Sequence, residues 1–285
     1  MCQQTVARLV LSILSQVCES PFTLSMDRTN WKFGKVDINI LAVGIVHKGY
    51  AFPIAWILLP KKGNSNTAER KRVMEKVLKV LSLDQIEVLL ADREFIGKEW
   101  FQWLMKQKIC FDIRVKENLT IHTKGKKKKV KTLFRGVKEK EPRHLKKNIE
   151  ICGCLLFVTG TRVDGEYCIV VSDTFRPDAI GTYLKRWGIE TLFGCFKSRG
   201  FNFEDTHLKD PEKISKLFSI LAIAFTWVHL VGEWLNKKKP IKVKKHGRKA
   251  KSLFRLGLDF LQKILFNLHH DFPLLLRSFR FLSCT

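Results

Sequence analysis

Acidic residues are scarce in this chain of 285 residues, which has 27 Asp and Glu against 52 Lys and Arg. The formal net charge of +25 repels acidic solutes and attracts polyanions, so nucleic acid is the first partner to expect and an anionic membrane the second. The same charge could serve solubility alone. Because 45% of the residues are hydrophobic, the chain is not disordered, and its length suits one large domain or one domain with an insertion.

The eight cysteines include no pair at the Cys-x2-Cys spacing of metal sites. Most of them lie inside apolar runs, which favours reduced, small core residues of a cytosolic protein. Cys152 and Cys154 are separated by one residue, and we expect them to lie on one face of a strand rather than to bind a metal.

Signals for export or membrane insertion are also weak. The N-terminus lacks the basic region of a signal peptide, and its apolar stretch is short and broken by serine. The only long apolar run extends from Leu217 to Gly232; it is slightly short for a membrane span and contains His229. A buried core helix is therefore favoured, and no membrane is expected among the partners.

Residues 22–118 alternate between strand-like and helix-like patterns. Two β-rich runs joined by the sequence His-Lys-Gly-Tyr predict a hairpin at residues 38–60, and a shorter extended run precedes them. An amphipathic helix, a continuous apolar strand, a second helix and a further strand follow. The order β-β-β-α-β-α-β predicts an α/β fold, a mixed sheet flanked by helices, and it is the order of the ribonuclease-H-like fold.

Changes in charge and in hydrophobic pattern along the sequence divide the chain into five expected segments. They are a short N-terminal helix (1–21), the first part of the core (22–118), a β-rich insertion (119–175), the second part of the core with the helix that carries Glu190 (176–236), and a basic linker with a C-terminal helix (237–285). The linker is dense in Lys and contains Pro and Gly, so we expect it to be mobile unless phosphates hold it.

Three acidic residues lie in apolar stretches of the sequence, where exposure to solvent alone does not explain a charged side chain. Asp27 lies within an apolar strand, Asp92 closes another strand, and Glu190 lies on a helix among aromatic residues. Each has an ordinary explanation by itself, because a strand-terminal Asp often caps the next turn and a helical Glu often pairs with an Arg one turn away. If the first strand lies beside the fourth, however, Asp27 and Asp92 project side by side, and a helix across that edge brings Glu190 to them.

Three clustered carboxylates repel one another strongly in a poorly solvated site. A divalent cation removes that repulsion, and oxygen-only ligands suit Mg²⁺ or Mn²⁺ rather than zinc. Two such ions, held by Asp27, Asp92 and Glu190, can activate a water or a 3′-hydroxyl and stabilise the departing oxygen of a phosphodiester. The pattern therefore indicates metal-dependent chemistry on nucleic acid.

The sequence around Glu190 resembles that of the DDE transposases of the insertion-sequence 4 family. Their signature is Tyr-x2-Arg-x3-Glu-x6-Lys, and its four positions are filled here by Tyr183, Arg186, Glu190 and Lys197. The sequence Ala-Asp-Arg-Glu-Phe around Asp92 adds to the resemblance, which covers about residues 22–230.

This resemblance implies a ribonuclease-H-like core in which Asp27, Asp92 and Glu190 are the catalytic residues and the metal ligands. It implies an enzyme that cleaves double-stranded DNA at element ends and transfers the 3′-hydroxyl ends into target DNA, with Mg²⁺ or Mn²⁺ as the cofactor. It also implies a homodimer in the DNA complex and a place in the bacterial cytoplasm, at the nucleoid.

The four signature positions are expected on one helix, here called the signature helix. Four residues of this helix are expected to contact DNA. Arg186 and Lys197 would grip backbone phosphates, and Tyr183 would hydrogen-bond one. Trp187 either stacks on a displaced base or packs in the core.

Other points stay open. Arg93 and Glu94 either support the metal ligands or form an ordinary surface ion pair. About twenty residues precede the first strand, whereas transposases of this family usually carry a separate N-terminal domain for end recognition, so we interpret residues 1–21 as a remnant. Two alternative functions follow: a non-catalytic DNA-binding inhibitor of full-length transposase, and a nuclease of the same fold that only hydrolyses.

Overall fold

The computed structural model describes residues 2–123, 126–245 and 247–283. The chain forms two compact units, which we call the sheet unit and the helical unit. The sheet unit comprises residues 20–51 and 55–191. The helical unit comprises the residues up to Glu19, the stretch Phe52–Ile54 and the residues from Leu192 onward.

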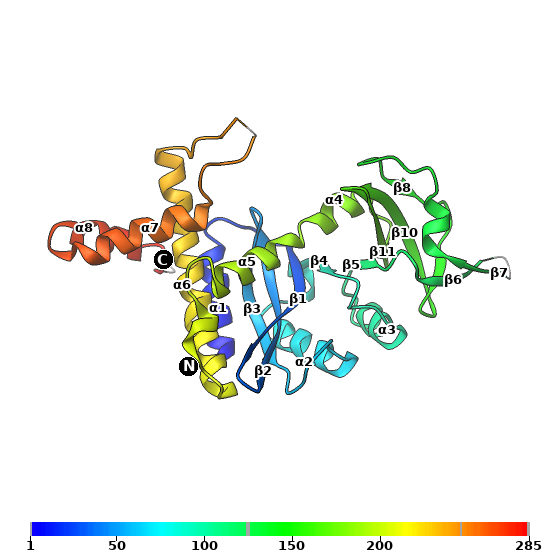
Figure 1. The fold of residues 1–285 in the computed structure, drawn as a ribbon, viewed down its shortest axis with the longest axis horizontal. Coiled ribbons are helices and arrows are strands. Elements are labelled where there is room, and N and C mark those ends of the chain that lie inside the picture. The colour runs from blue at the N-terminus through cyan, green and yellow to red at the C-terminus, as the bar shows by residue number, and fades with distance from the viewer. Residues whose placement is uncertain (1, 124–125, 246, 284–285) are drawn as a thin grey trace. The chain divides into compact units, whose positions relative to one another are not determined.

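Three strands come first in the sheet, and helices and strands then alternate (Figure 1). The elements are β1 (Phe22–Phe33), β2 (Val36–His47), β3 (Tyr50–Leu58), α2 (Thr67–Leu78), β4 (Ile86–Ala91), α3 (Lys98–Lys106) and β5 (Phe111–Val115). The order is the predicted β-β-β-α-β-α-β, and the prediction of an α/β fold with a mixed sheet is confirmed.

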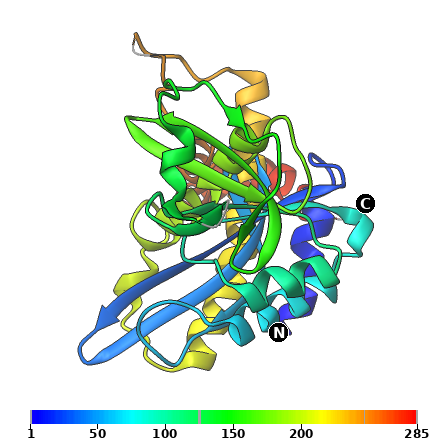
Figure 2. The ribbon, with the colours of Figure 1, turned by 90° about the vertical axis from the view of Figure 1, so that its right-hand side faces the viewer.

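The central strand pairs have the directions that a mixed sheet requires. β1 is antiparallel to β2, and together they form a long ribbon (Figure 2). On its other side β1 is parallel to β4, which is in turn parallel to β5. The predicted hairpin between β2 and β3 is present: Lys48 and Gly49 have φ of 47° and 82°, as in a type I′ turn. The residues from Val88 to Ala91 are fully buried, as the continuous apolar run predicts.

The β-rich segment that follows divides between two sheets. Its strands are β6 (Thr120–Thr123), β7 (Lys126–Lys129), β8 (Arg143–His144), β9 (Ile149–Ile151), β10 (Cys154–Val163) and β11 (Glu166–Ser172). β11 pairs antiparallel with β5, so the main sheet continues in the order β3-β2-β1-β4-β5-β11-β10-β8. β6 and β7 form a separate two-stranded sheet.

The expectation for Cys152 and Cys154 is wrong. Cys152 and Gly153 form the two-residue turn between β9 and β10, with φ of 52° and 72°, and only Cys154 belongs to a strand. Because Cys152 belongs to the turn, the two residues are not positions i and i+2 of one strand. Among the residues that the structure describes, Cys18, Cys110, Cys152, Cys154, Cys168 and Cys195 form no disulfide.

The signature helix is not continuous. α4 (Ala179–Leu184) ends before Arg186, and α5 (Trp187–Lys197) begins after it. Across the break the amide of Arg186 bonds to the carbonyl of Tyr183, and that of Ile189 bonds to the carbonyl of Arg186, three residues back instead of four. The prediction of one helix is therefore wrong at this point.

The helical unit is built on one long central helix. It contains α1 (Gln3–Leu14), α6 (Pro211–Lys238), α7 (Leu253–Phe266) and α8 (Leu268–Phe279). The predicted single C-terminal helix is thus two helices, because Asn267 leaves the helical conformation (φ −123°, ψ 42°) between α7 and α8.

α6 contains the long apolar run of the sequence. In the part of the chain that the structure describes, it is the one helix that could cross a membrane by length and composition, yet 56% of its most apolar window is buried. It packs against α1 and α7, and its Phe225 lies 5.3 Å, between ring centres, from Phe52. This packing agrees with the predicted core helix.

Candidate active site

Asp27, within β1, and Asp92, directly after β4, lie on neighbouring strands of the sheet. The parallel pairing of β1 with β4 ends at Met26 opposite Ala91, and each aspartate is the next residue along its chain. The strand adjacency that the sequence argument needed is thus confirmed. Each carboxylate accepts a hydrogen bond of 2.7 Å from the backbone amide of the residue that follows it, Arg28 or Arg93, which fixes its direction.

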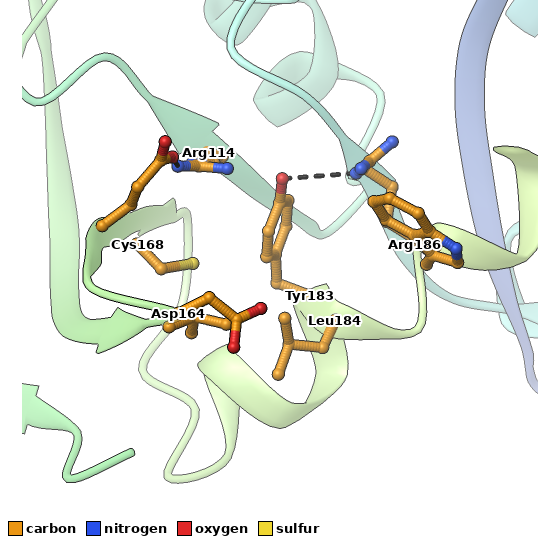
Figure 3. A pocket seen from close by; sticks show the side chains of 9 residues that line it. Arg114, Asp164, Cys168, Tyr183, Leu184 and Arg186 are labelled. Carbon is orange, nitrogen blue, oxygen red and sulfur yellow. Dashed lines mark hydrogen bonds and ion pairs between the residues drawn. The ribbon is translucent and has the colours of Figure 1, made fainter. Parts of the chain in front are cut away.

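Arg186 connects these acids to Glu190. Its Nη1 donates to Asp27 Oδ2 at 3.1 Å, and its Nη2 donates to Glu190 Oε1 at 2.5 Å. Its Nε donates to the Tyr183 hydroxyl at 3.2 Å (Figure 3), and that hydroxyl donates to Asp92 Oδ1 at 3.3 Å. These five residues, which we call the Arg186 network, bring the three predicted carboxylates together around one guanidinium and one phenol.

Three members of the network are largely withdrawn from water, whereas the side chain of Glu190 is 36% exposed. Only 6% of Arg186 and 3% of Tyr183 is exposed, and 17% of the Asp27 side chain. Burial raises the pKa of Asp27 to about 7, against the hydrogen bond from Arg28 and the charge of Arg186, which lower it. Burial alone would lower the pKa of Arg186, but Tyr183, Glu190 and Asp27 together raise it. Burial also raises the pKa of Tyr183, so its hydroxyl stays a donor.

The break between α4 and α5 positions Arg186. Its carbonyl, which turns away from the α-helical pattern, accepts a hydrogen bond of 3.2 Å from Ser25 Oγ on β1. Gly188 allows the close approach of α5 to β3: a Cβ at this position would lie 2.8 Å from the backbone carbon of Tyr50. A continuous helix would not bring this carbonyl to β1.

A second arginine, which the sequence interpretation missed, lies beside the network. Arg28 forms an ion pair with Glu94 at 3.4 Å and donates to Asn39 Oδ1 at 3.2 Å. The Glu94 side chain is only 19% exposed, and its charge contributes to the raised pKa of Asp27. Of the two alternatives for Glu94, support of the acidic residues is therefore favoured over a surface ion pair. In a chain with 52 Lys and Arg, the sequence gives no signal that singles out Arg28.

A pocket of about 520 Å³ adjoins the network (Figure 3). Its lining residues are Arg114, Val163, Asp164, Glu166, Cys168, Tyr183, Leu184, Arg186 and Trp187. Trp187 is 63% exposed, so the alternative in which it packs in the core is wrong. Arg114 also lines a second pocket of about 360 Å³, together with Arg93 and Lys116. The sequence interpretation singled out neither Arg114, on β5, nor Cys168, on β11, as a site residue.

Lys197, the last residue of the signature, belongs to the helical unit. Its Nζ forms an ion pair of 2.5 Å with Glu204, and burial lowers its pKa. A phosphate contact by Lys197 stays a prediction.

The donor chemistry of the network suits a hard divalent cation. Its acids supply only oxygen ligands, and the raised pKa of Asp27 indicates a carboxylate that a cation would stabilise in the ionised form. Within residues 2–123, 126–245 and 247–283, however, no group of three or more His, Cys, Asp or Glu side chains is arranged as a metal-ligand set. Arg186 lies between Asp27 and Glu190 instead, so metal binding requires this guanidinium to move.

Comparisons with known proteins point to one family. The search of curated proteins finds no match. Among solved structures, endonuclease V from Bacillus subtilis is similar at 11% sequence identity over 72% of this chain and 95% of that chain, with a TM-score of 0.34, which is too low to establish a shared fold. The family model of the transposase DDE domain matches residues 17–227. The match spans most of the chain, including all five residues of the Arg186 network, and the chain belongs to the transposase DDE domain family.

Proposed function

We propose that the chain is the catalytic domain of a DNA transposase that cleaves phosphodiesters at element ends and joins the 3′-hydroxyl ends to target DNA. The convergence of Asp27, Asp92 and Glu190 on Arg186, in a chain of the DDE domain family, supports this function most directly. The spacing of Tyr183, Arg186, Glu190 and Lys197 further supports the insertion-sequence 4 family.

We assign Asp27, Asp92 and Glu190 as the catalytic residues and the ligands of Mg²⁺ or Mn²⁺. The metal would supply activation of a water or a 3′-hydroxyl and stabilisation of the departing oxygen. Arg186 keeps the acids together without the metal, because it neutralises two of them at once. Tyr183 orients Asp92 through its hydroxyl, and the backbone amides after Asp27 and Asp92 hold one oxygen of each carboxylate.

DNA would approach the network from the side of the exposed Trp187. The indole can stack on an unpaired base, and a phosphate beside the network can take the guanidinium of Arg186 from the acids. Double-stranded DNA is the partner that the charge of +25 favours, at the nucleoid of a bacterial cytoplasm.

The strand order β3-β2-β1-β4-β5, with β1 antiparallel to β2 and parallel to β4, supports assignment to the ribonuclease-H-like fold. In this assignment β10 and β11 belong to an insertion between Asp92 and Glu190 that extends the sheet. The segments 1–21, 22–118, 119–175, 176–236 and 237–285 remain our proposal for the domain organisation.

A strand-transfer assay tests the function. Pre-cleaved DNA ends, taken from the sequence that flanks the gene, are incubated with the full chain, a target plasmid and Mn²⁺. Joined products support the transposase. Hydrolysis alone would assign the chain as a nuclease, and binding without chemistry as an inhibitory remnant. Undiminished cleavage in chelator would contradict the metal dependence.

A further inference from the structure

The helix α2 carries a buried arginine, Arg70. It is 5% exposed and lies on the same face of α2 as the buried Val73 and Val77. Burial lowers the pKa of its guanidinium, against the charges of Glu94 and Glu69, which raise it. A charged group withdrawn from water is costly unless its donors are paired, so the partners of Arg70 indicate what this side chain holds in place.

The donors of Arg70 go to two loops. Its Nη2 donates to the carbonyl of Ser65 at 2.7 Å and to that of Glu94 at 2.8 Å, and its Nη1 donates to the carbonyl of Ile96 at 3.3 Å. Its Nε donates to Ser65 Oγ at 3.1 Å. The guanidinium carbon lies 5.2 Å from the centre of the Phe95 ring, which is fully buried. Arg70 thus joins the loop before α2 to the loop between β4 and α3.

The loop between β4 and α3, residues 92–97, begins at an acid of the candidate active site. The carbonyl of Asp92 accepts a hydrogen bond of 2.9 Å from the amide of Phe95, which closes a turn. The amide of Arg93, inside this turn, donates to the Asp92 carboxylate at 2.7 Å. The conformation of the loop therefore sets the direction of the Asp92 carboxylate.

The same loop also reaches Asp27. The side chain of Glu94 forms an ion pair of 3.4 Å with Arg28, and the amide of Arg28 donates to the Asp27 carboxylate at 2.7 Å. Because Arg70 holds the carbonyl of Glu94, it fixes the point from which the Glu94 side chain extends to Arg28. Both aspartates are thus connected to one guanidinium on α2.

We propose that Arg70 is a positioning residue for the metal site, which holds the loop after Asp92 so that the carboxylates of Asp92 and Asp27 face one cation. The inference rests on the proposed function. Arg70 acts through backbone carbonyls in different directions, which its planar set of donors suits. Phe95 anchors the loop in the core, so loss of the Arg70 donors should displace the loop without detaching it. Residues that orient metal ligands in this way typically change metal affinity by about 10–100-fold when they are replaced.

Binding of Mn²⁺ tests this role without relying on turnover. The full chain, bound to a duplex of the sequence that flanks the gene, is titrated with Mn²⁺, and free Mn²⁺ is measured by electron paramagnetic resonance; binding to the duplex alone is subtracted. Arg70→Met keeps a long stem and removes the donors. It should raise the dissociation constant for Mn²⁺ at least about tenfold and leave the affinity for the duplex unchanged. Cleavage should need correspondingly more Mn²⁺ and return towards the wild-type rate at saturation.

Controls separate positioning from stability. Arg72→Met makes the same change at an exposed position of α2 and should bind Mn²⁺ as the wild type does. Gly257→Ala crowds the backbone of α6 in the helical unit, so it should destabilise the chain without changing the affinity for Mn²⁺. Arg70→Lys keeps the charge but reaches fewer carbonyls, so it should weaken Mn²⁺ binding less than Arg70→Met does.

The outcomes distinguish this inference from the proposed function. Wild-type affinity for Mn²⁺ in Arg70→Met, or in Arg70→Lys where Arg70→Met does not fold, would overturn the role of Arg70 and leave the proposed function standing. So would a loss of affinity that Gly257→Ala shares, because it would follow from stability alone. A wild-type chain that binds no Mn²⁺ and cleaves no DNA would overturn the proposed function, and the role of Arg70 with it.

Discussion

A single guanidinium organises the acids of the candidate active site. Arg186 can serve Asp27, Glu190 and Tyr183 together because its donors are fixed in one plane and point in three directions. The ammonium group of a lysine is a point charge on a flexible chain, and it cannot reach the same three partners at once. The identity of this residue, and not only its charge, therefore matters for the site.

Arg186→Lys should reduce metal-dependent cleavage by about a hundredfold and lower the free energy of unfolding by about 1–3 kcal/mol, because buried partners lose their donors. Cleavage rates and urea unfolding measure the two effects. Lys185→Arg, at the exposed neighbouring position, is the control and should change neither. Full activity in Arg186→Lys would show that charge alone suffices.

Glu190→Gln and Asp27→Asn separate metal binding from DNA binding. Both substitutions keep the size of the side chain and remove the charge that would hold Mg²⁺ or Mn²⁺, so cleavage should fall by several orders of magnitude while DNA affinity persists. Cleavage in Mn²⁺ and a filter-binding titration on the same proteins measure this. Glu75→Gln, on the exposed side of α2, should behave as wild type. Wild-type cleavage by Glu190→Gln would make that carboxylate structural.

Asp112, which lies outside the Arg186 network, makes the stability of the fold depend on pH. It is fully buried, accepts a hydrogen bond of 2.5 Å from Ser172 Oγ and lies 3.9 Å from Arg176. Burial raises its pKa from 3.8 to about 6, although Ser172 and Arg176 oppose the rise. Between these pH values the folded chain holds the proton more tightly than the unfolded chain, so this contribution to stability is complete below about pH 4 and is lost as pH rises through about 6.

Asp112→Asn removes this titration. The free energy of unfolding of the variant, relative to wild type, should therefore rise between about pH 4.5 and pH 7.5, as measured by urea unfolding at several pH values. Ser172→Ala removes a donor to the ionised carboxylate and should move the window to higher pH. A difference between Asp112→Asn and wild type that does not vary with pH would contradict the assignment.

Among the elements, the sheet was easier to predict than the helices around the site. The continuous apolar run of β4 and the turn at Lys48 and Gly49 are local patterns with direct physical causes, and both predictions were confirmed. The break at Arg186 was not predictable, because it depends on Ser25 and Tyr50, which are far away in the sequence. The ion pair of Arg186 with Asp27 is for the same reason visible only in the folded chain, whereas its pairing with Glu190, one helical turn away, was among the alternatives that the sequence offered.

The contact between α6 and α7 depends on two glycines. A Cβ at Gly257 would lie 1.9 Å from the carbonyl oxygen of Val228, and one at Gly232 would lie 2.0 Å from that of Leu253. Both neighbours are backbone atoms, so they cannot rotate aside. These glycines allow the two helices to pack at a distance that no other residue permits.

Gly257→Ala should therefore lower the free energy of unfolding by about 2 kcal/mol or more, despite the better helix propensity of alanine. Gly194→Ala in α5 is the control, because its Cβ would meet only the Arg199 side chain, 3.2 Å away, which can shift. Thermal and urea unfolding of both variants measure the difference. A Gly257→Ala chain as stable as wild type would mean that α6 and α7 can separate without cost.

At the scale of the whole molecule, the charge of +25 makes DNA affinity depend steeply on salt. Two exposed lysine-rich segments could supply the contacts: β7 and the chain between α6 and α7, here called the basic linker. Successive side chains of a strand point to opposite faces, so only half of the lysines of β7 can face one duplex. The described part of the basic linker is a turn, in which the amide of Lys244 bonds to the carbonyl of Arg248 and the amide of Ala250 to that of Lys242. Its lysines are therefore not divided between two opposite faces.

Replacing Lys242, Lys244 and Lys245 with alanine should reduce the slope of log affinity against log salt by up to about 2.7, at about 0.9 for each lost phosphate contact. The charge-matched control replaces Lys126, Lys127 and Lys128 of β7, and its slope should fall by less. Fluorescence anisotropy on one duplex at several salt concentrations measures both. Because the two variants lose the same net charge, equal losses of slope would show that DNA responds to the total charge of the molecule, whereas a larger loss in the first would place the phosphate contacts on the basic linker.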